Sequence, residues 1–460
     1  MKQQHKTPTA KQERLLTRDV LLILTATFCY MSAAMVGNPI IASFAGSMGA
    51  SGVMMGLISA IMSAVALFCR PIAGNLADRT SKRILACSGA ALFLISDAWY
   101  ALAPNDVSLL LARIVNGIGF ACISVCMATW LSMLLPLSRM GAGMGLYGTV
   151  NAISQAVGPG TGILVSRYFG YRISFAVAAV LCLGTVVAVL LVKDSGLPLA
   201  LKKQRSAEPV LATQEVPDPV LDAEIAAPAD ASSDSRTSNT STTQPATTTS
   251  HKSFRELFNH LFEVRVLPIA GIFMLFGLGY FANQSFLVNY CNALHLNASP
   301  SLFFLVYAFA VFILRIVMRN WFDTKSFRFF LVIGTFGTAA MLLALTFMQN
   351  DILLIVAAIM TAFSYGIMSS VTQAEAVVIA GKSRSGMANT TYYAAIDLSM
   401  CLGPMLGGVL FGSLPTRWLY PMFLLTLPLA WIIFLACHRR MAAARQEMLA
   451  KSVEAAVSQQ

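Results

Sequence analysis

The chain divides into apolar runs that are each long enough to cross a lipid bilayer. Of its 460 residues, 57% are hydrophobic and only 12% are charged, whereas soluble domains are roughly 45–50% apolar and about 25% charged. Crossing the hydrocarbon as a helix takes ~20 apolar residues. Because backbone in contact with lipid must satisfy its own hydrogen bonds, each run is expected to be helical. We predict an all-α membrane protein with twelve spans, over residues 19–44, 51–73, 84–103, 107–135, 141–167, 172–192, 266–291, 299–318, 329–348, 352–380, 386–412 and 417–437.

Basic side chains gather at every second junction between these runs, which is the positive-inside pattern. Only Arg167, Arg172 and Arg417 fall at the other junctions. The net charge of +11 therefore reports membrane topology and not a nucleic-acid partner. We expect a multi-pass protein of the inner or plasma membrane with both termini in the cytoplasm. The junctions assigned to the cytoplasm carry Arg79, Lys82, Arg83, Arg139, Lys193, Lys202, Lys203, Arg319, Lys325, Arg328, Lys382, Arg384, Arg439 and Arg440.

The two halves of the chain repeat one another at an offset of 245 residues. The matches fall on polar, Gly and Pro positions at corresponding places in the apolar runs, where composition alone explains them poorly. They indicate two six-helix bundles, 19–192 and 266–437, related by a pseudo-twofold axis. Duplicated halves around a central site are a transporter architecture. The matching pairs include Asn38 and Asn283, Arg70 and Arg315, Asp78 and Asp323, Asn105 and Asn350, Tyr147 and Tyr392, Gly158 and Gly403, and Arg172 and Arg417.

Four segments lie outside the bundles. Residues 1–18 and 438–460 are expected to be cytoplasmic tails, and the first span is expected to remain uncleaved. Residues 193–252 are rich in Ala, Ser, Thr and Pro and lack an apolar face, which predicts a disordered cytoplasmic linker. Residues 253–265 place apolar side chains at helical spacing, so they predict an amphipathic helix at the inner membrane surface. Packing of that helix beneath the bundle is the alternative.

Several chemistries have no recognisable signature in this sequence. The nine cysteines lie in or beside apolar runs and form no CxxC pair, so they are expected to be free thiols. No phosphate-binding loop of the Gly-x-x-x-x-Gly-Lys-Ser/Thr type occurs, and no metal-binding cluster is visible. We therefore expect no cofactor, no metal and no enzymatic activity. A channel would need a polar ring or filter, and a monomeric duplicated bundle shows none.

The loop after the second span carries the most specific motif. It reads Gly74-Asn-Leu-Ala-Asp78-Arg79-Thr-Ser-Lys82-Arg83 and resembles the signature loop of the major facilitator superfamily, with a serine in place of the second glycine. The resemblance implies a latch between the halves, in which Asp78 faces the start of span eleven, where the helix dipole favours a carboxylate. The repeat places Asp323 in the corresponding role. The predicted cytoplasmic gate comprises Gly74, Asp78, Arg79, Lys82, Arg83, Asp323 and Arg328.

Three charged residues within spans are the candidates for proton coupling: Asp97, Arg113 and Asp397. Arg113 lies in Arg113-Ile-Val-Asn116-Gly-Ile-Gly, which is similar to the fourth-span motif of the same superfamily, and charged residues in spans are usually functional. A buried ion pair between Asp97 and Arg113, which should lie at similar depth, is the structural alternative. Asp397 has no partner in its own helix. Since a lone buried charge is costly, a proton would neutralise it, as coupling requires.

Spans five and eleven carry a third motif. Ser154-Gln-Ala-Val-Gly158-Pro159-Gly-Thr-Gly162 is similar to a motif of proton-coupled exporters of this superfamily, and Gly403-Pro404-Met-Leu-Gly407-Gly repeats its closing part. Small residues let helices approach closely, and proline bends a helix. We expect a tight, hinged contact between the halves at Gly158, Pro159, Gly162, Gly403, Pro404 and Gly407.

Polar side chains within the spans are candidates to line a central cavity, although helix-to-helix hydrogen bonding is the alternative for several of them. They are Asn38, Asn151, Gln155, Asn283, Gln284, Tyr147 and Tyr392. The resemblance implies alternating access by rocking of the two bundles. The hypothesis is proton-driven efflux of a small amphiphilic drug or metabolite. The alternative is proton-coupled uptake of a nutrient such as a sugar or organic acid.

Overall fold

The computed structural model describes residues 16–135, 140–194, 196, 263–318, 321, 324–381 and 385–457. Within these ranges the chain is helical apart from turns, loops and one isolated bridge between Asn297 and Asn350. Eleven of the described helical segments are long and apolar enough to cross a membrane. α5 (Met140–Phe169) is not among these eleven, and its 30 residues are rich in Gly. The all-α membrane fold with twelve helices is confirmed.

Six of these helices form the N-terminal half. Their starts follow from local hydrogen bonding, because Thr17, Ser51 and Asn105 each accept a backbone N–H of the first turn with the side chain, as N-cap residues do. Short loops then connect helices that run antiparallel. The helices are α1 (Arg18–Ser47), α2 (Gly52–Arg79), α3 (Lys82–Leu102), α4 (Asp106–Leu134), α5 (Met140–Phe169) and α6 (Tyr171–Leu191).

The C-terminal half repeats this plan with two interruptions. Asn350 caps its helix as Asn105 does, by accepting a backbone N–H. Span ten, which we predicted as one helix, contains a π-helical turn, and span twelve is broken between two prolines, Pro421 and Pro428. The elements are α9 (Leu267–Ala293), α10 (Pro300–Val317), α12 (Phe327–Thr346), α13 (Asp351–Thr361), η2 (Ala362–Gly366), α14 (Ile367–Ala380), α15 (Ser385–Ser413), α16 (Leu419–Phe423) and α17 (Thr426–Val457).

Two segments outside the bundles differ from their predictions. α17 continues to Val457, so most of the segment predicted as a C-terminal tail is helical. Nε of Arg445 in this extension lies 3.6 Å from Oε1 of Glu375 in α14. The predicted linker and amphipathic helix fall largely outside the described residues. The last three residues of the predicted amphipathic helix, Glu263–Arg265, lie in a turn.

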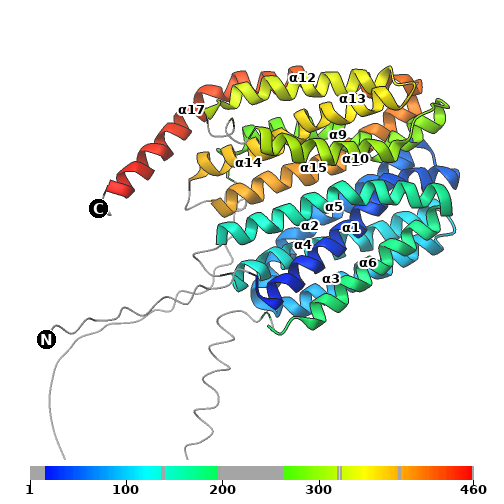
Figure 1. Cartoon of the computed structure of the whole chain (residues 1–460), viewed down its shortest axis with the longest axis horizontal. Coiled ribbons are helices and arrows are strands. Elements are labelled where there is room, and N and C mark those ends of the chain that lie inside the picture. The colour runs from blue at the N-terminus through cyan, green and yellow to red at the C-terminus, as the bar shows by residue number, and fades with distance from the viewer. Residues whose placement is uncertain are drawn as a thin grey trace, which may run out of the picture. The chain divides into compact units, whose positions relative to one another are not determined.

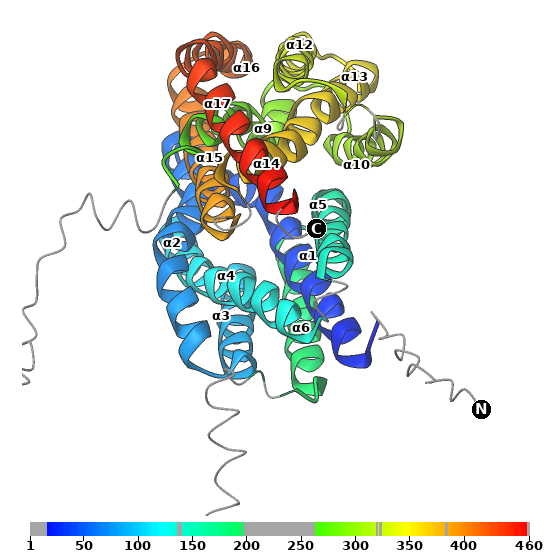
Figure 2. The same cartoon turned by 90° about the vertical axis from the view of Figure 1, so that its left-hand side faces the viewer.

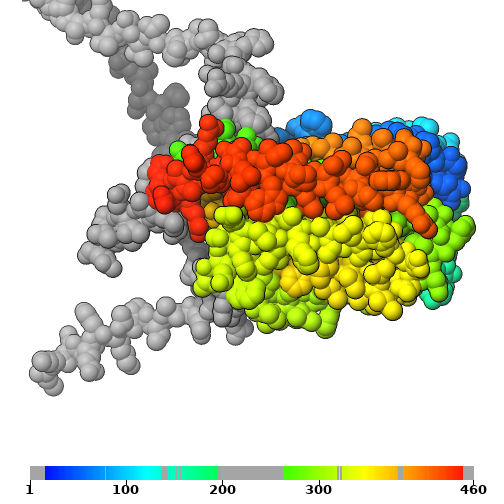
Figure 3. All heavy atoms as spheres, turned by 90° about the horizontal axis from the view of Figure 1, so that it is seen from above, coloured from blue at the N-terminus to red at the C-terminus, as the bar shows by residue number. Residues whose placement is uncertain are grey.

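Three helices of each half form the seam between the halves. α2 packs against α15 on one side, α5 lies beside α10 on the other, and α1 contacts α9 between them, as the view along the bundle shows (Figure 2). All helices run nearly along one direction (Figure 1). From above, α12 and α13 cover the C-terminal half beside α17 (Figure 3). We call the end of the bundle where residue 193 leaves α6 the linker end, and the opposite end the far end.

Candidate functional site

The two halves touch through backbone at the far end of the α2–α15 contact. A Cβ atom built on Gly56 would lie 2.7 Å from the carbonyl oxygen of Pro404 and 2.8 Å from Cα of Gly408. A Cβ on Gly52 would lie 2.7 Å from Cα of Gly412. Only glycine fits where two helix backbones approach this closely. We call these four glycines, Gly52, Gly56, Gly408 and Gly412, the seam glycines.

The halves separate toward the linker end. On the α5–α10 side, Ser301 approaches Gly160 at the far end, with its oxygen 3.6 Å from a Cβ built there. Further along the same face of α5, Ile153 and Val157 are each 47% exposed. On the α2–α15 side, a Cβ on Gly74 would meet nothing within 4 Å, and Tyr393 is 46% exposed. A cleft between the halves therefore opens at the linker end.

An ion pair between the halves closes the inner limit of this cleft. Arg70 of α2 donates from Nη2 to Oδ1 of Asp397 in α15 at 2.9 Å, and its Nε lies 2.6 Å from Oδ2. The Asp397 side chain is 4% exposed, and the guanidinium lies 5.8 Å from the ring centre of Phe120. The pair sits one helical turn from the open positions Gly74 and Tyr393, so it marks where the α2–α15 contact ends.

Asp397 was predicted as a coupling residue, but its partner Arg70 was not. The repeat singled out Arg70 as a match to Arg315, and an arginine inside a span is itself a functional signal. The missing step was pairing a lone carboxylate with a lone guanidinium in the other half. Sequence alone does not give the depth and facing of helices in two different bundles.

Asp97 and Arg113 do not form the ion pair offered as their structural alternative. Asp97 is 3% exposed and accepts hydrogen bonds from the Cys182 thiol at 3.3 Å and from Nδ2 of Asn116 at 3.5 Å. Asn116 also donates to Ser96 at 2.6 Å. Both Asp97 and Arg113 lie buried within the N-terminal half, away from the ion pair at the seam.

Arg113 instead binds three helices of its own half together. Its Nε donates to the carbonyl oxygen of Ile58 at 3.1 Å, and its Nη2 donates to Ser59 O at 3.3 Å and to Oδ1 of Asn38 at 3.2 Å. Arg113 belongs to α4, Ile58 and Ser59 to α2, and Asn38 to α1. The five donors of a guanidinium suit such a clamp. Its geometry in this conformation fits a structural clamp.

The residues predicted to line a cavity mostly hydrogen-bond between helices. Tyr147 meets Tyr30 at 3.3 Å, Asn283 accepts from Tyr420 at 2.9 Å, and Tyr392 donates to Ser369 O at 2.6 Å. Asn151 donates to the carbonyl oxygen of Tyr147 in its own helix, and Gln155 is partly exposed. Gln284 crosses the seam, since its Nε2 lies 3.8 Å from Sδ of Met35.

The glycines of the span-five and span-eleven motifs pack within their own halves, so the predicted contact between halves is not where we placed it. A Cβ on Gly158 would lie 2.4 Å from Cβ of Met35, and one on Gly162 would lie 2.2 Å from Val36 O, both in α1. Gly403 and Gly407 face α9 in the same way. These pairs, four residues apart, share the face opposite the seam. Of the predicted set, Pro404 contacts the other half through its carbonyl oxygen, which lies near Gly56.

The predicted gate residues lie at the linker end, and two of them bind their own half. The buried Lys82 donates its backbone N–H to Gly196 O at 2.9 Å, and Arg83 donates to Leu190 O. The first bond holds the segment that follows α6, and the second holds the last turn of α6. Arg79 and Arg328 are exposed. Asp323 and the side chain of Asp78 lie outside what the structure describes.

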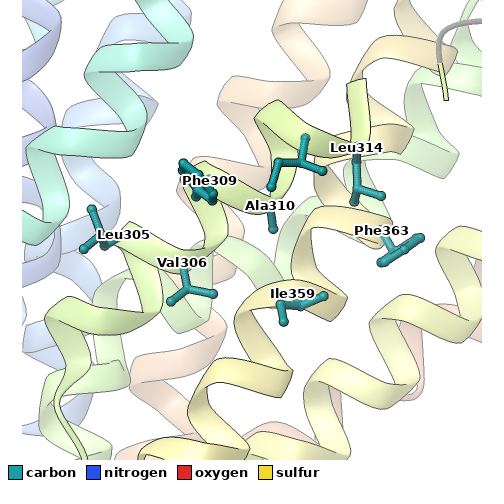
Figure 4. Close-up of a pocket in the computed structure, with 8 residues that line it drawn as sticks. Leu305, Val306, Phe309, Ala310, Leu314, Ile359 and Phe363 are labelled. Carbon is teal, nitrogen blue, oxygen red and sulfur yellow. The ribbon is translucent and has the colours of Figure 1, made fainter. Parts of the chain in front are cut away.

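A separate groove of about 570 Å³ lies between α10 and the α13–η2 segment. Its lining is wholly apolar (Figure 4) and consists of Leu305, Val306, Phe309, Ala310, Ile313, Leu314, Ile359 and Phe363. Leu305 and Phe309 are 62% and 68% exposed, so this face of α10 is expected to contact lipid. With no polar group, the groove offers nothing that could bind a proton or a charged ligand.

Comparison with known sequences identifies the family. The sequence model described as Major Facilitator Superfamily matches residues 23–326 and 291–451. The chain belongs to the Major Facilitator Superfamily. This confirms the family resemblance of the loop at Gly74–Arg83.

Similar proteins include an uncharacterized transporter and a drug-resistance protein. The chain is 24% identical over 160 residues to the uncharacterized MFS-type transporter MJ1560 of Methanocaldococcus jannaschii, covering 35% of this chain and 42% of that protein. It is 23% identical over 157 residues to the quinolone resistance protein NorA of Staphylococcus aureus, covering 34% and 40%. These matches thus span about two fifths of each relative's length.

Solved structures share the fold over nearly the whole chain. A peptide transporter POT in complex with sulfate has a TM-score of 0.66 at 12% identity, covering 93% of this chain and 95% of that one. A POT family transporter in complex with a thioalcohol-conjugated peptide has a TM-score of 0.61 at 13% identity, covering 92% and 96%. At such identities the likeness establishes the fold alone.

Proposed function

We propose that this protein is a secondary active transporter that works by alternating access and exports a small amphiphilic compound in exchange for protons. The observation that carries this proposal is the Arg70–Asp397 ion pair, which joins the halves at the inner limit of an open cleft. The quinolone resistance of the similar NorA protein supports the direction of transport. The positive-inside pattern supports a cytoplasmic linker end.

The charge balance of the pair provides a route from proton binding to movement. An ionised Asp397 attracts Arg70 and holds α2 against α15, and charge pairs in a low-dielectric setting interact strongly. A proton on Asp397 would cancel that attraction, and the seam would then depend on the seam glycines alone. Protonation from the external side and release to the cytoplasm would thus bias the halves between their two arrangements.

Transport by inside-out vesicles tests this function. Vesicles with and without the protein are given an acidic lumen and a mixed metabolite extract containing a quinolone, and the accumulated compounds are identified by mass spectrometry. We expect at least one unmodified compound to accumulate only with the protein, and a protonophore to abolish its accumulation. Accumulation that survives the protonophore would contradict proton coupling, and simple equilibration would indicate a channel.

A further inference from the structure

The internal repeat is symmetric at Arg70 but not at its partner. An offset of 245 residues relates Arg70 of α2 to Arg315 of α10, and the α2–α15 contact to the α10–α5 contact. The position that corresponds to Asp397 is Ala152 in α5. Arg315 accordingly forms no ion pair with any residue that the structure describes. Arg70 is thus neutralised by Asp397, whereas its counterpart Arg315 has no ion-pair partner among the described residues.

Arg315 lies on the face of α10 that is turned toward α5. Ser301, Ala308 and Arg315 follow one another at seven-residue intervals along one stripe, and the backbone carbonyl oxygen of Ser301 adjoins α5 at Gly160. The lipid-facing stripe is different: Leu305, Phe309, Phe312 and Ile316 are all more than 60% exposed. Arg315 itself is exposed at the level where α5 and α10 have separated, and its guanidinium lies within electrostatic range of Tyr392 in α15. Its side chain therefore belongs to the cleft.

Arg315 lies in the last turn of α10, close to the linker end. An arginine of a membrane span needs water or an anion for its guanidinium. The cleft can supply both.

The wall opposite Arg315 is apolar. Along α5, the face that begins at Gly160 continues through Val157 and Ile153, each 47% exposed. On α10, Ala308 is partly buried in the same stripe as Arg315. A ligand between these two helices would meet a single guanidinium at the linker end and aliphatic side chains above it.

From this asymmetry we infer that Arg315 is the anion-binding residue of the substrate site, and that the transported compounds are organic anions with an apolar body. The carboxylate of the substrate takes the place that a carboxylate at position 152 would occupy by symmetry. The guanidinium geometry suits a carboxylate with two parallel hydrogen bonds. This inference rests on the proposed transport function and assigns its substrate class.

Binding of a matched probe pair tests the inference. The probes are 1-naphthoate and its neutral counterpart 1-naphthamide, measured by equilibrium dialysis with the purified full-length protein. The variants are Arg315→Gln, Arg315→Lys and, as a control, Arg440→Gln, which changes an exposed arginine of α17. Hydrogen bonds to a charged group correspond to about tenfold or more in affinity.

We expect the wild-type protein to bind naphthoate at least about tenfold more tightly than naphthamide. Arg315→Gln should remove this preference and leave naphthamide binding unchanged, Arg315→Lys should retain part of it, and Arg440→Gln should retain all of it. Equal binding of the two probes by the wild type, unaltered naphthoate binding by Arg315→Gln, or no naphthoate binding at millimolar concentration would each overturn the inference.

Vesicle transport separates this inference from the function on which it depends. If the compounds that accumulate under an acidic lumen are neutral or cationic, proton-driven export stands and the assignment of Arg315 fails. If no compound accumulates with the protein while naphthoate binding requires Arg315, the anion site stands and the direction or coupling of transport fails.

Discussion

The charge of Asp397 would not be stable at its buried position without Arg70. Breaking a buried pair by removing one partner usually costs more than the pair contributes, because an uncompensated charge is left behind. Asp397 is 4% exposed in the structure, so water compensates it poorly. A proton is the smallest change that lets the two side chains part. That is why this one pair, and not a surface ion pair, can connect proton binding to the position of two helices.

Replacing Asp397 by asparagine fixes this position in a neutral state. We expect Asp397→Asn to be inserted in the membrane normally and to lose the dependence of transport on external pH, since no group remains at the seam to be protonated. Initial rates in vesicles at a series of lumenal pH values measure this. The matched control is Glu375→Gln, which removes a carboxyl that pairs with Arg445 away from the seam and should keep the pH dependence. A variant Asp397→Asn that still responds to pH would place coupling elsewhere.

The sequence indicated which charged residues matter and not how they are paired. Asp397, Asp97 and Arg113 stood out because charges within spans are rare. Their partners depend on which face each helix presents, and one residue changes that facing by about 100°. The Asp97–Arg113 pair was plausible in depth, yet Arg113 turns toward α1 and α2 and Asp97 toward Cys182.

At the scale of helices, glycine determines which pairs can touch. α2 and α15 approach through the seam glycines, whereas Gly158 and Gly162 bring α5 against α1. Sequence analysis recognised the small-residue motifs, but a motif does not state which neighbouring helix it faces. In the structure the motif glycines pack α5 against α1 and α15 against α9, within each half. The spacing of four residues keeps both glycines of each motif on one face.

A side chain at a seam glycine should prevent closure of the far end. In Gly408→Val a Cβ would lie 2.5 Å from Cα of Gly56, and overpacking of this kind costs about 1–3 kcal/mol. Because about 1.4 kcal/mol is a tenfold change in an equilibrium, the linker-open state should lose most of its population and transport should slow. Gly271→Ala is the control, since its Cβ would meet only Ile433, at 4.0 Å. Vesicle transport rates compare the two, and an unimpaired Gly408→Val would show that this contact is dispensable.

The clamp at Arg113 should matter for stability of the N-terminal half. Arg113→Gln removes donors to Ile58 O and Ser59 O, and hydrogen bonds from a charged group contribute about 1.5–3 kcal/mol each. We expect a clear fall in the apparent melting temperature of the detergent-purified protein. Arg113→Lys, which keeps the charge but not the planar fork, should recover only part of it. Equal melting temperatures for wild type and Arg113→Gln would rule out the clamp.

At the scale of the whole molecule, the fold was more predictable than the site. Apolar length, charge placement and the 245-residue repeat were enough to give twelve spans in two bundles, because lipid leaves the backbone few alternatives. The π-helical turn η2 and the break before α17 are local departures that preserve the path of the span, so hydropathy does not detect them. The structure is closed at the far end and open at the linker end. This conformation depends on contacts between the halves, and the sequence alone does not show which of those contacts form.

Alternating access requires that the far-end contact between α5 and α10 break in each cycle. Gly160 and Ser301 adjoin in the structure, with 3.6 Å between the Ser301 oxygen and a Cβ built on Gly160. In a variant without the nine native cysteines, Gly160→Cys with Ser301→Cys should therefore cross-link on mild oxidation and stop transport, and reduction should restore it.

The control pair lies on the same two helices at the linker end. Thr149 precedes Gly160 by eleven residues and Phe312 follows Ser301 by eleven residues. Both positions therefore lie toward that end, and both are exposed. Thr149→Cys with Phe312→Cys should resist direct oxidation in this conformation, because a disulfide requires Cβ atoms about 3.5–4.5 Å apart. Gel mobility after oxidation measures both cross-links, and vesicle transport measures their effect. If the far-end pair were cross-linked and transport continued, the two halves could not be exchanging access by separating at that end.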